Sequence, residues 1–212
     1  MKSNKFLLPL AVLLCVGAGF IFWRQFSSRH VNLQPSAAAG EVLVGEVARL
    51  AGGSGQVILI SRPLTKGEPD ATGERVTAFT EALRRQPTLK LATEWAPRPP
   101  GVVMDLGAIT PEQFLSGLDK NPGANVLVVF AGLPSWSQTM TEKVASRSLK
   151  VVAVCGYGPN VRRWLESKAL SLAVVPRFDD PPAGAPAPKT AKEWFEREFQ
   201  FITPASLAQL PY

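Results

Sequence analysis

Five short apolar runs, each separated from the next by a segment with helical spacing, constrain the fold more than any other feature of this chain. They occupy Val57–Ser61, Leu89–Trp95, Asn125–Phe130, Lys150–Cys155 and Leu172–Val175. The third run is continuously apolar after its first residue, as is typical of a strand covered on both faces. Strands that alternate with helices favour right-handed crossovers and a parallel sheet between helical layers. We predict an α/β, doubly wound domain with five mostly parallel strands in the order 2-1-3-4-5.

The segments between these runs carry the signals expected of helices. Residues 73–86 repeat apolar side chains at helical spacing. Thr110–Gln113 combines a threonine cap, a proline in the first turn and a glutamine placed to return the capping bond. A weaker helix is predicted over residues 137–146, and a further helix over residues 160–168. A second capping box at Thr190 predicts a last helix that includes Phe199.

Phe6–Trp23 is a run of eighteen uncharged, mostly apolar residues with two basic residues on each side. About 20 such residues span a bilayer core as a helix. A cleaved signal peptide is the competing interpretation, but the apolar run continues past the small residues Val16-Gly17-Ala18. We expect residues 1–30 to be a signal anchor or transmembrane segment, with the following domain outside the cytoplasm, in the periplasm. The balanced basic flanks leave the membrane orientation open.

Residues 31–55 are predicted to join this anchor to an α/β domain that occupies residues 56–212. Proline, serine and three consecutive alanines over residues 31–40 are typical of a short stalk, and residues 41–50 show helical spacing. The glycine-rich stretch Ala51–Gly55 ends that helix and precedes a strand. A phosphate-binding loop follows a strand and opens a helix instead. We therefore interpret this stretch as a connector.

The net charge of +6 belongs largely to the region around the predicted anchor. Residues 1–40 contain four basic and no acidic residues. The remaining 19 basic and 17 acidic residues give residues 41–212 a net charge of only +2. A nearly neutral domain lacks the basic surface that nucleic acids require, so we expect no nucleic-acid partner.

The sequence lacks the residues that most catalytic and metal-binding sites need. The single histidine, His30, lies beside the predicted anchor, which leaves the domain without a Ser-His or Cys-His pair or a histidine metal site. The acidic residues are scattered, without the spacing of a metal cluster or of a paired acid and base. We expect no enzyme activity, no metal and no cofactor.

Cys155 is the remaining candidate for reactive chemistry, because it ends a strand and is followed by glycines and arginines. A thiolate that holds an anion has an arginine six residues after the cysteine, but that position is Val161. Arg162 comes one residue late, and a shift of one residue turns a side chain by about 100° around a helix. We therefore interpret Cys155 as a small buried residue at a strand end.

Three stretches resemble units of the type 1 periplasmic sugar-binding proteins. "TPEQFLSGLDKNPGANVLVVFAGLP" (110–134) is similar to a helix–strand unit with a ligand-facing turn. "KVVAVCGYGPNVRRWLESKALSLAVVPRF" (150–178) is similar to the next unit, and "EWFEREFQFITPASLAQLP" (193–211) to the carboxy-terminal tail. The resemblance implies the fold of a sugar-binding lobe. Members of that family close two lobes around a ligand, whereas this chain has room for one. A lone lobe binds weakly, associates with a second copy or another envelope protein, or serves as a scaffold.

In open parallel sheets the ligand crevice lies beyond the carboxyl ends of the strands. Aromatic rings there can stack on sugar rings, and arginines can donate to hydroxyls or carboxylates. These considerations predict binding of a small, sugar-like ligand; the alternative is a structural or interaction module, in which the same side chains cover the sheet and Arg177 pairs with a neighbouring aspartate. The predicted ligand-binding residues are Arg62, Trp95, Trp136, Tyr157 and Arg177.

Overall fold

The computed structural model describes residues 32–61, 70–95, 111–133, 137–156, 158–179 and 184–210. These residues form a six-stranded sheet in the order β2-β1-β3-β4-β5-β6. The neighbouring pairs from β2 to β5 are parallel, and β6 runs antiparallel to β5. The predicted α/β class and the order of the first five strands are confirmed. The strands are β1 (Gly55–Ile60), β2 (Leu89–Trp95), β3 (Ala124–Val129), β4 (Lys150–Val154), β5 (Leu172–Pro176) and β6 (Phe199–Ile202).

The sixth strand corrects the prediction of a last helix that includes Phe199. Helix α7 (Ala191–Glu198) stops at Glu198, and Phe199 is already extended, with φ −134° and ψ 164°. Apolar side chains then alternate between the two faces of the sheet: Phe201 packs against the first core cluster and Ile202 is buried in the second. Aromatic and β-branched residues with a period of two favour a strand. The pairing with β5 therefore outweighs the helical signal that began at Thr190.

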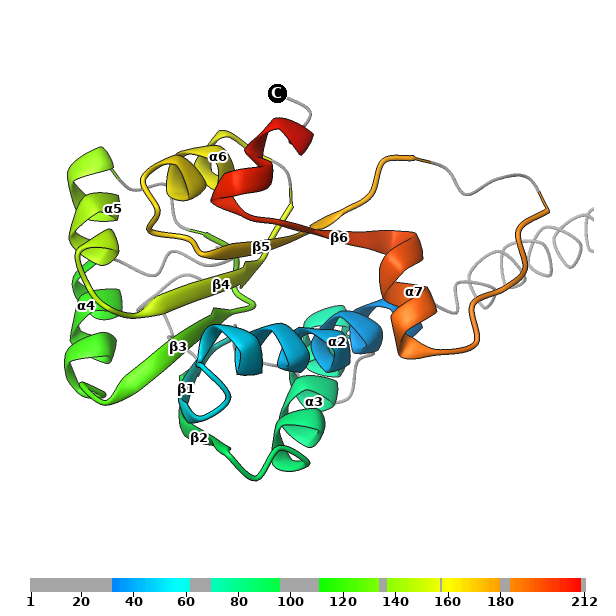
Figure 1. Cartoon of the computed structure of the whole chain (residues 1–212), viewed down its shortest axis with the longest axis horizontal. Coiled ribbons are helices and arrows are strands. Elements are labelled where there is room, and N and C mark those ends of the chain that lie inside the picture. The colour runs from blue at the N-terminus through cyan, green and yellow to red at the C-terminus, as the bar shows by residue number, and fades with distance from the viewer. Residues whose placement is uncertain are drawn as a thin grey trace, which may run out of the picture. The chain divides into compact units, whose positions relative to one another are not determined.

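Helices cover both faces of the sheet (Figure 1). On one face, α2, α3 and α7 supply Leu43, Phe79 and Phe195 to the first core cluster. On the other face, α4, α5 and α6 supply Phe114, Val144 and Trp164 to the second. Burial on both faces explains why the central strands are continuously apolar. Besides α7, the helices are α2 (Gln34–Leu50), α3 (Ala71–Arg84), α4 (Pro111–Asp119), α5 (Gln138–Ala145), α6 (Pro159–Glu166) and the short 3-10 helix η1 (Pro204–Gln209).

Helix α2 begins at Gln34, seven residues before the predicted helix, so most of the segment interpreted as a stalk is helical. Ala38 and Ala39 are 1% and 0% exposed. Alanine is the strongest helix former, and its small side chain lets α2 lie close to α3. At Gly40, an added Cβ would collide with the carbonyl oxygen of Arg75 and lie 3.0 Å from the amide nitrogen of Phe79. The composition that resembled a stalk is therefore that of a tightly packed helix.

Residues 6–23, the predicted membrane anchor, lie outside the part of the chain that the structure describes. Among the helices in the described ranges, none combines the length and the apolar character needed to cross a bilayer.

Two glycines of α2 provide a matched test of this packing. We expect Gly40→Ala to lower the free energy of unfolding by about 1–3 kcal/mol, because the new methyl group meets the α3 backbone. Gly45→Ala is the control: no atom lies within 4 Å of its added Cβ, and alanine stabilises an exposed helical position by about 0.5–1 kcal/mol. Urea denaturation of the two variants measures both changes. Equal effects at the two positions would contradict the close α2–α3 contact.

Candidate ligand-binding site

The carboxyl ends of β1, β3, β4 and β5 meet at one edge of the sheet because these strands are parallel. At two of these ends, the residue that directly follows the strand is buried. Ser61, directly after β1, is 1% exposed, and Phe130, directly after β3, is 4% exposed. The amide of Phe130 donates to the carbonyl oxygen of Ile60 at 2.7 Å. The residues that directly follow β1 and β3 are therefore out of reach of a ligand, whereas Gly156, after β4, is exposed.

Four of the five predicted ligand-binding residues fall where the structure does not describe the side chain. Arg62, Trp136 and Tyr157 lie outside the described ranges, and Trp95 is described only as the last backbone position of β2. Their convergence on one site therefore stays a prediction. Arg177 is described and lies at the predicted edge, directly after β5.

Arg177 is held at the point where β5 pairs with β6. Its amide donates to the carbonyl oxygen of Glu198 at 2.8 Å, and its Nε donates to the carbonyl oxygen of Phe199 at 3.0 Å. The predicted alternative, an ion pair with a neighbouring aspartate, is not formed with Asp179, and Asp180 lies outside the described residues. The first bond fixes the backbone and the second fixes one side of the guanidinium, which leaves its terminal nitrogens to donate to another group.

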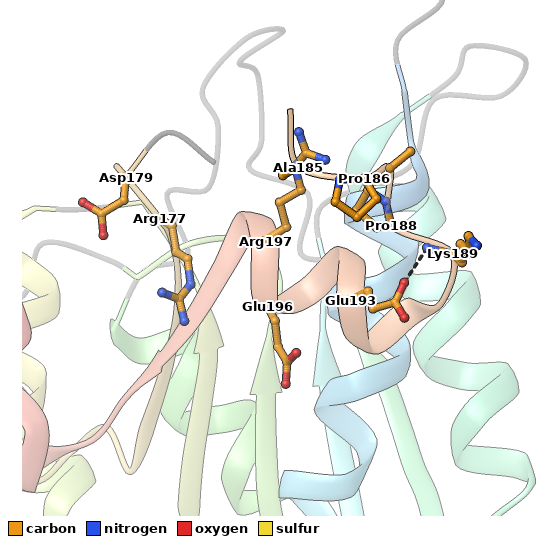
Figure 2. Close-up of a pocket in the computed structure, with 10 residues that line it drawn as sticks. Arg177, Asp179, Ala185, Pro186, Pro188, Lys189, Glu193, Glu196 and Arg197 are labelled. Carbon is orange, nitrogen blue, oxygen red and sulfur yellow. Dashed lines mark hydrogen bonds between the residues drawn. The ribbon is translucent and has the colours of Figure 1, made fainter. Parts of the chain in front are cut away.

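A groove of about 580 Å³ adjoins Arg177, between the segment that follows β5 and helix α7 (Figure 2). Small-molecule sites measure about 300–1,000 Å³, so a monosaccharide fits its volume. One wall is an apolar stretch of alternating alanine and proline, and the rest is charged. The lining residues are Arg177, Asp179, Ala185, Pro186, Ala187, Pro188, Lys189, Glu193, Glu196 and Arg197.

Two of the three carboxylates in this groove already have partners. Glu193 accepts hydrogen bonds from the amides of Lys189 at 2.6 Å and Thr190 at 3.4 Å, which completes the capping box of α7. Glu196 lies 3.7 Å from the ammonium of Lys192. Sequence reasoning missed the cations Lys189 and Arg197, because they reach this edge only through the unpredicted pairing of β6 with β5.

Cys155 packs at the end of β4 against the second core cluster, as expected for a structural residue. Its burial raises the pKa of the thiol to about 12, so the thiol is protonated at neutral pH. Helix α6 faces the sheet with Val161 and Trp164, which are 3% and 0% exposed, whereas Arg162 forms an ion pair with Glu166 at 3.8 Å. No group of three or more metal-ligating side chains occurs within the described ranges.

Alkylation tests the environment of Cys155. The thiolate is the reactive species, and a pKa of about 12 instead of the usual 9.0 lowers its fraction at pH 8 by roughly a thousandfold. We expect iodoacetamide to modify Cys155 in the folded chain at least a hundredfold more slowly than in urea-unfolded chain. Mass spectrometry of the peptide that contains Cys155 separates this signal from Cys15. Equal rates in both states would show an accessible, reactive thiol.

The fold is that of a periplasmic-binding-protein-like α/β lobe, and it is shared with solved structures of sugar-binding proteins. AraP, an arabinose-binding protein from Geobacillus stearothermophilus, matches with a TM-score of 0.59 and 11% identity. A solute-binding protein of an ABC transporter from Agrobacterium vitis, bound with α-D-tagatopyranose, matches with a TM-score of 0.57 and 17% identity. The XylFII–LytSN complex matches with a TM-score of 0.52 and 14% identity. The resemblance inferred from the sequence is confirmed at the level of the fold.

These matches cover most of this chain but only part of each matched protein. They include 84% of this chain for AraP and the Agrobacterium vitis protein, and 81% for the XylFII–LytSN complex. The matched share of those chains is 63%, 61% and 60%, so this chain spans less than two thirds of their length. At the level of sequence, no protein-family model and no curated protein matches.

Proposed function

We propose that this chain is a membrane-anchored, extracytoplasmic, non-catalytic domain that binds a small polar ligand such as a sugar. The observation that carries the proposal is the groove beside Arg177, at the sheet edge where ligands of open α/β domains bind. The fold shared with sugar-binding proteins supports it. The protonated thiol of Cys155 supports a role without a nucleophile.

The chemistry of the groove fits a polar ligand that lacks a large apolar surface. A guanidinium donates from several N–H groups in a fixed fork, which suits adjacent hydroxyls of a sugar ring. The wall of residues 185–188 offers apolar contact to the C–H groups of the same ring. The groove is open on one side and encloses only part of a ligand, so we expect weak binding from this lobe alone.

Thermal unfolding of the full-length protein in detergent tests sugar binding. At a sugar concentration ten times the Kd, binding raises the free energy of unfolding by about 1.4 kcal/mol, and the midpoint of thermal unfolding rises. We expect at least one monosaccharide of a panel to produce this shift. Arg177→Gln is expected to weaken binding of that sugar at least about tenfold, because the guanidinium donors are lost.

The control is Arg84→Gln, which removes an exposed arginine from the last turn of α3. It is expected to leave the sugar-induced shift unchanged. Arg177→Gln also loses the bond to Phe199, so the ligand-induced shift is compared rather than the midpoint itself. A folded protein that no sugar stabilises would contradict the proposal.

Membrane attachment through residues 6–23 is tested by placing charges in the apolar run. Arginine at the centre of a spanning helix costs about 2.5–3.5 kcal/mol, so we expect Leu13→Arg combined with Leu14→Arg to release the chain from membranes. Leu91→Arg, at a 39% exposed position of β2, is the control and stays attached. Carbonate extraction followed by intact-mass measurement gives the readout. A wild-type product that has lost its first residues would show a cleaved signal peptide instead.

A structural or interaction module is the second candidate, favoured by a specific observation. Phe178, next to Arg177, is 62% exposed, so a large apolar side chain is available to a protein partner at this edge. One matched structure, XylFII–LytSN, is itself a complex. If the chain is such a module, we expect its molecular mass in sedimentation to rise with protein concentration and no sugar to stabilise it.

A further inference from the structure

We propose that one end of the domain is a binding surface for a linear acidic polysaccharide. This surface, the basic end, consists of the five segments that lead from a helix into strands β1–β5. Each is taken from the last residue of the helix to the second residue of the strand, which gives residues 50–56, 84–90, 119–125, 145–151 and 166–173. Because β1–β5 are parallel, all five segments lie at the edge of the sheet opposite the groove.

The positive charge of the domain is concentrated at the basic end. Its five segments contain seven basic and two acidic residues, a net charge of +5. The other described residues contain nine basic and twelve acidic residues, a net charge of −3. A nearly neutral total therefore hides a strongly positive surface at one edge of the sheet, and a surface of one sign attracts ions of the other.

Most of these cations are available to an external anion. Two of the seven are paired within the domain: Arg85 lies 3.3 Å from Glu41, and Arg147 lies 2.8 Å from Asp119. The remaining five are exposed and form no ion pair within the described ranges. They are Arg84, Lys90, Lys120, Lys150 and Lys168.

Stabilisation of helix ends does not account for all five cations. Arg84, Lys120 and Lys168 lie at or just beyond helix C-termini, where a cation interacts favourably with the helix dipole. Lys90 and Lys150 instead lie in strands β2 and β4. With β1 and β3 between them, these two positions are three strand spacings, or about 14 Å, apart across the sheet. The cations therefore extend along the edge, where a linear polymer with repeated charges contacts several of them.

The composition of the basic end favours a polymer over a protein partner. Protein interfaces contain a core of apolar side chains that become fully buried. The large apolar side chains that are exposed in the described ranges are Leu91 and Phe178, and neither belongs to the basic end. Contact through charge alone is typical of non-specific binding to a linear polyanion. Outside the cytoplasm, where we propose that the domain lies, such polymers are acidic polysaccharides, and this choice of polymer rests on that location.

The direction of α2 favours a partner in solution over the bilayer that would hold the predicted anchor. Its 17 residues span about 25 Å at 1.5 Å each. The helix finishes at the basic end, and its first turn, which follows the predicted anchor in the chain, lies beside α7 (Figure 1). The chain therefore enters the domain at the end of α2 that is away from the cations.

Interferometry on immobilised heparin, a linear polysaccharide with sulfates and carboxylates, tests the inference on the full-length protein in phosphatidylcholine nanodiscs. We expect heparin to bind, with an affinity that falls at least about tenfold between about 50 and 200 mM salt. Lys90→Gln combined with Lys150→Gln is expected to weaken binding at least about tenfold, because two charge-assisted contacts are lost. Lys120→Gln combined with Lys168→Gln is expected to have the same effect and replaces the first pair if that pair does not fold.

Lys189→Gln combined with Lys192→Gln is the matched control, because it removes the same charge beside the groove. It is expected to weaken heparin binding less than about twofold, since charges farther away than about 10 Å are largely screened. Equal losses in the control and in the variants of the basic end would mean that only the net charge matters, which would overturn the proposal.

Other results would overturn it as well. An affinity for heparin that does not change with salt, or a folded protein that does not bind heparin, would exclude the charged surface. Tighter binding to sensors that carry phosphatidylglycerol nanodiscs or double-stranded DNA would assign the surface to a lipid bilayer or a nucleic acid instead. Thermal unfolding shows whether each variant is folded. Any shift produced by a monosaccharide is expected to persist in the variants of the basic end, so sugar binding in the groove is judged separately.

Discussion

The antiparallel pairing of β6 with β5 is the interaction on which the candidate site depends. It places the end of α7 beside the carboxyl end of β5, where the amide of Arg177 donates to the carbonyl oxygen of Glu198 at 2.8 Å. Without this pairing, Arg197 and Arg177 would belong to unrelated segments. The pairing is secured by side chains on both faces of β6: Phe201 stacks on Phe195 with ring centroids 4.5 Å apart, and Ile202 is fully buried. A short edge strand thus determines which side chains line the groove.

The sequence specifies the sheet well because burial on two faces leaves a strong local signal. Residues 126–129 of the central strand β3 have no solvent-facing position, so each of them must be apolar. Such a run is too short for a buried helix. The signal at β6 is weaker because the strand has four residues and directly follows a helix. Judged from its neighbours in sequence, Phe199 could extend the helix or begin the strand. Its pairing with the distant strand β5 stabilises the strand.

The same contrast explains how much of the site was predictable. Arg177 follows a recognisable strand, and the rule that ligands bind beyond carboxyl ends is enough to select it. Arg197 lies in a polar helix, where an arginine is ordinarily a solvated side chain, and no local pattern marks it. Cys155 shows the opposite case. The segment around it resembles a reactive thiolate site, but the arginine comes one residue too late, and the buried Val161 stands where an arginine would be needed.

The position of one lining carboxylate follows from how helix α7 begins. A glutamate at position 193 is a local folding signal, because it returns a hydrogen bond to the amide of the capping residue Thr190. The same bonds, together with the one from Lys189, draw its negative charge toward backbone donors. If Glu193 were not held by the cap, its carboxylate could turn toward a cation of the groove. The bonds that start α7 therefore also fix the position of a carboxylate that lines the groove.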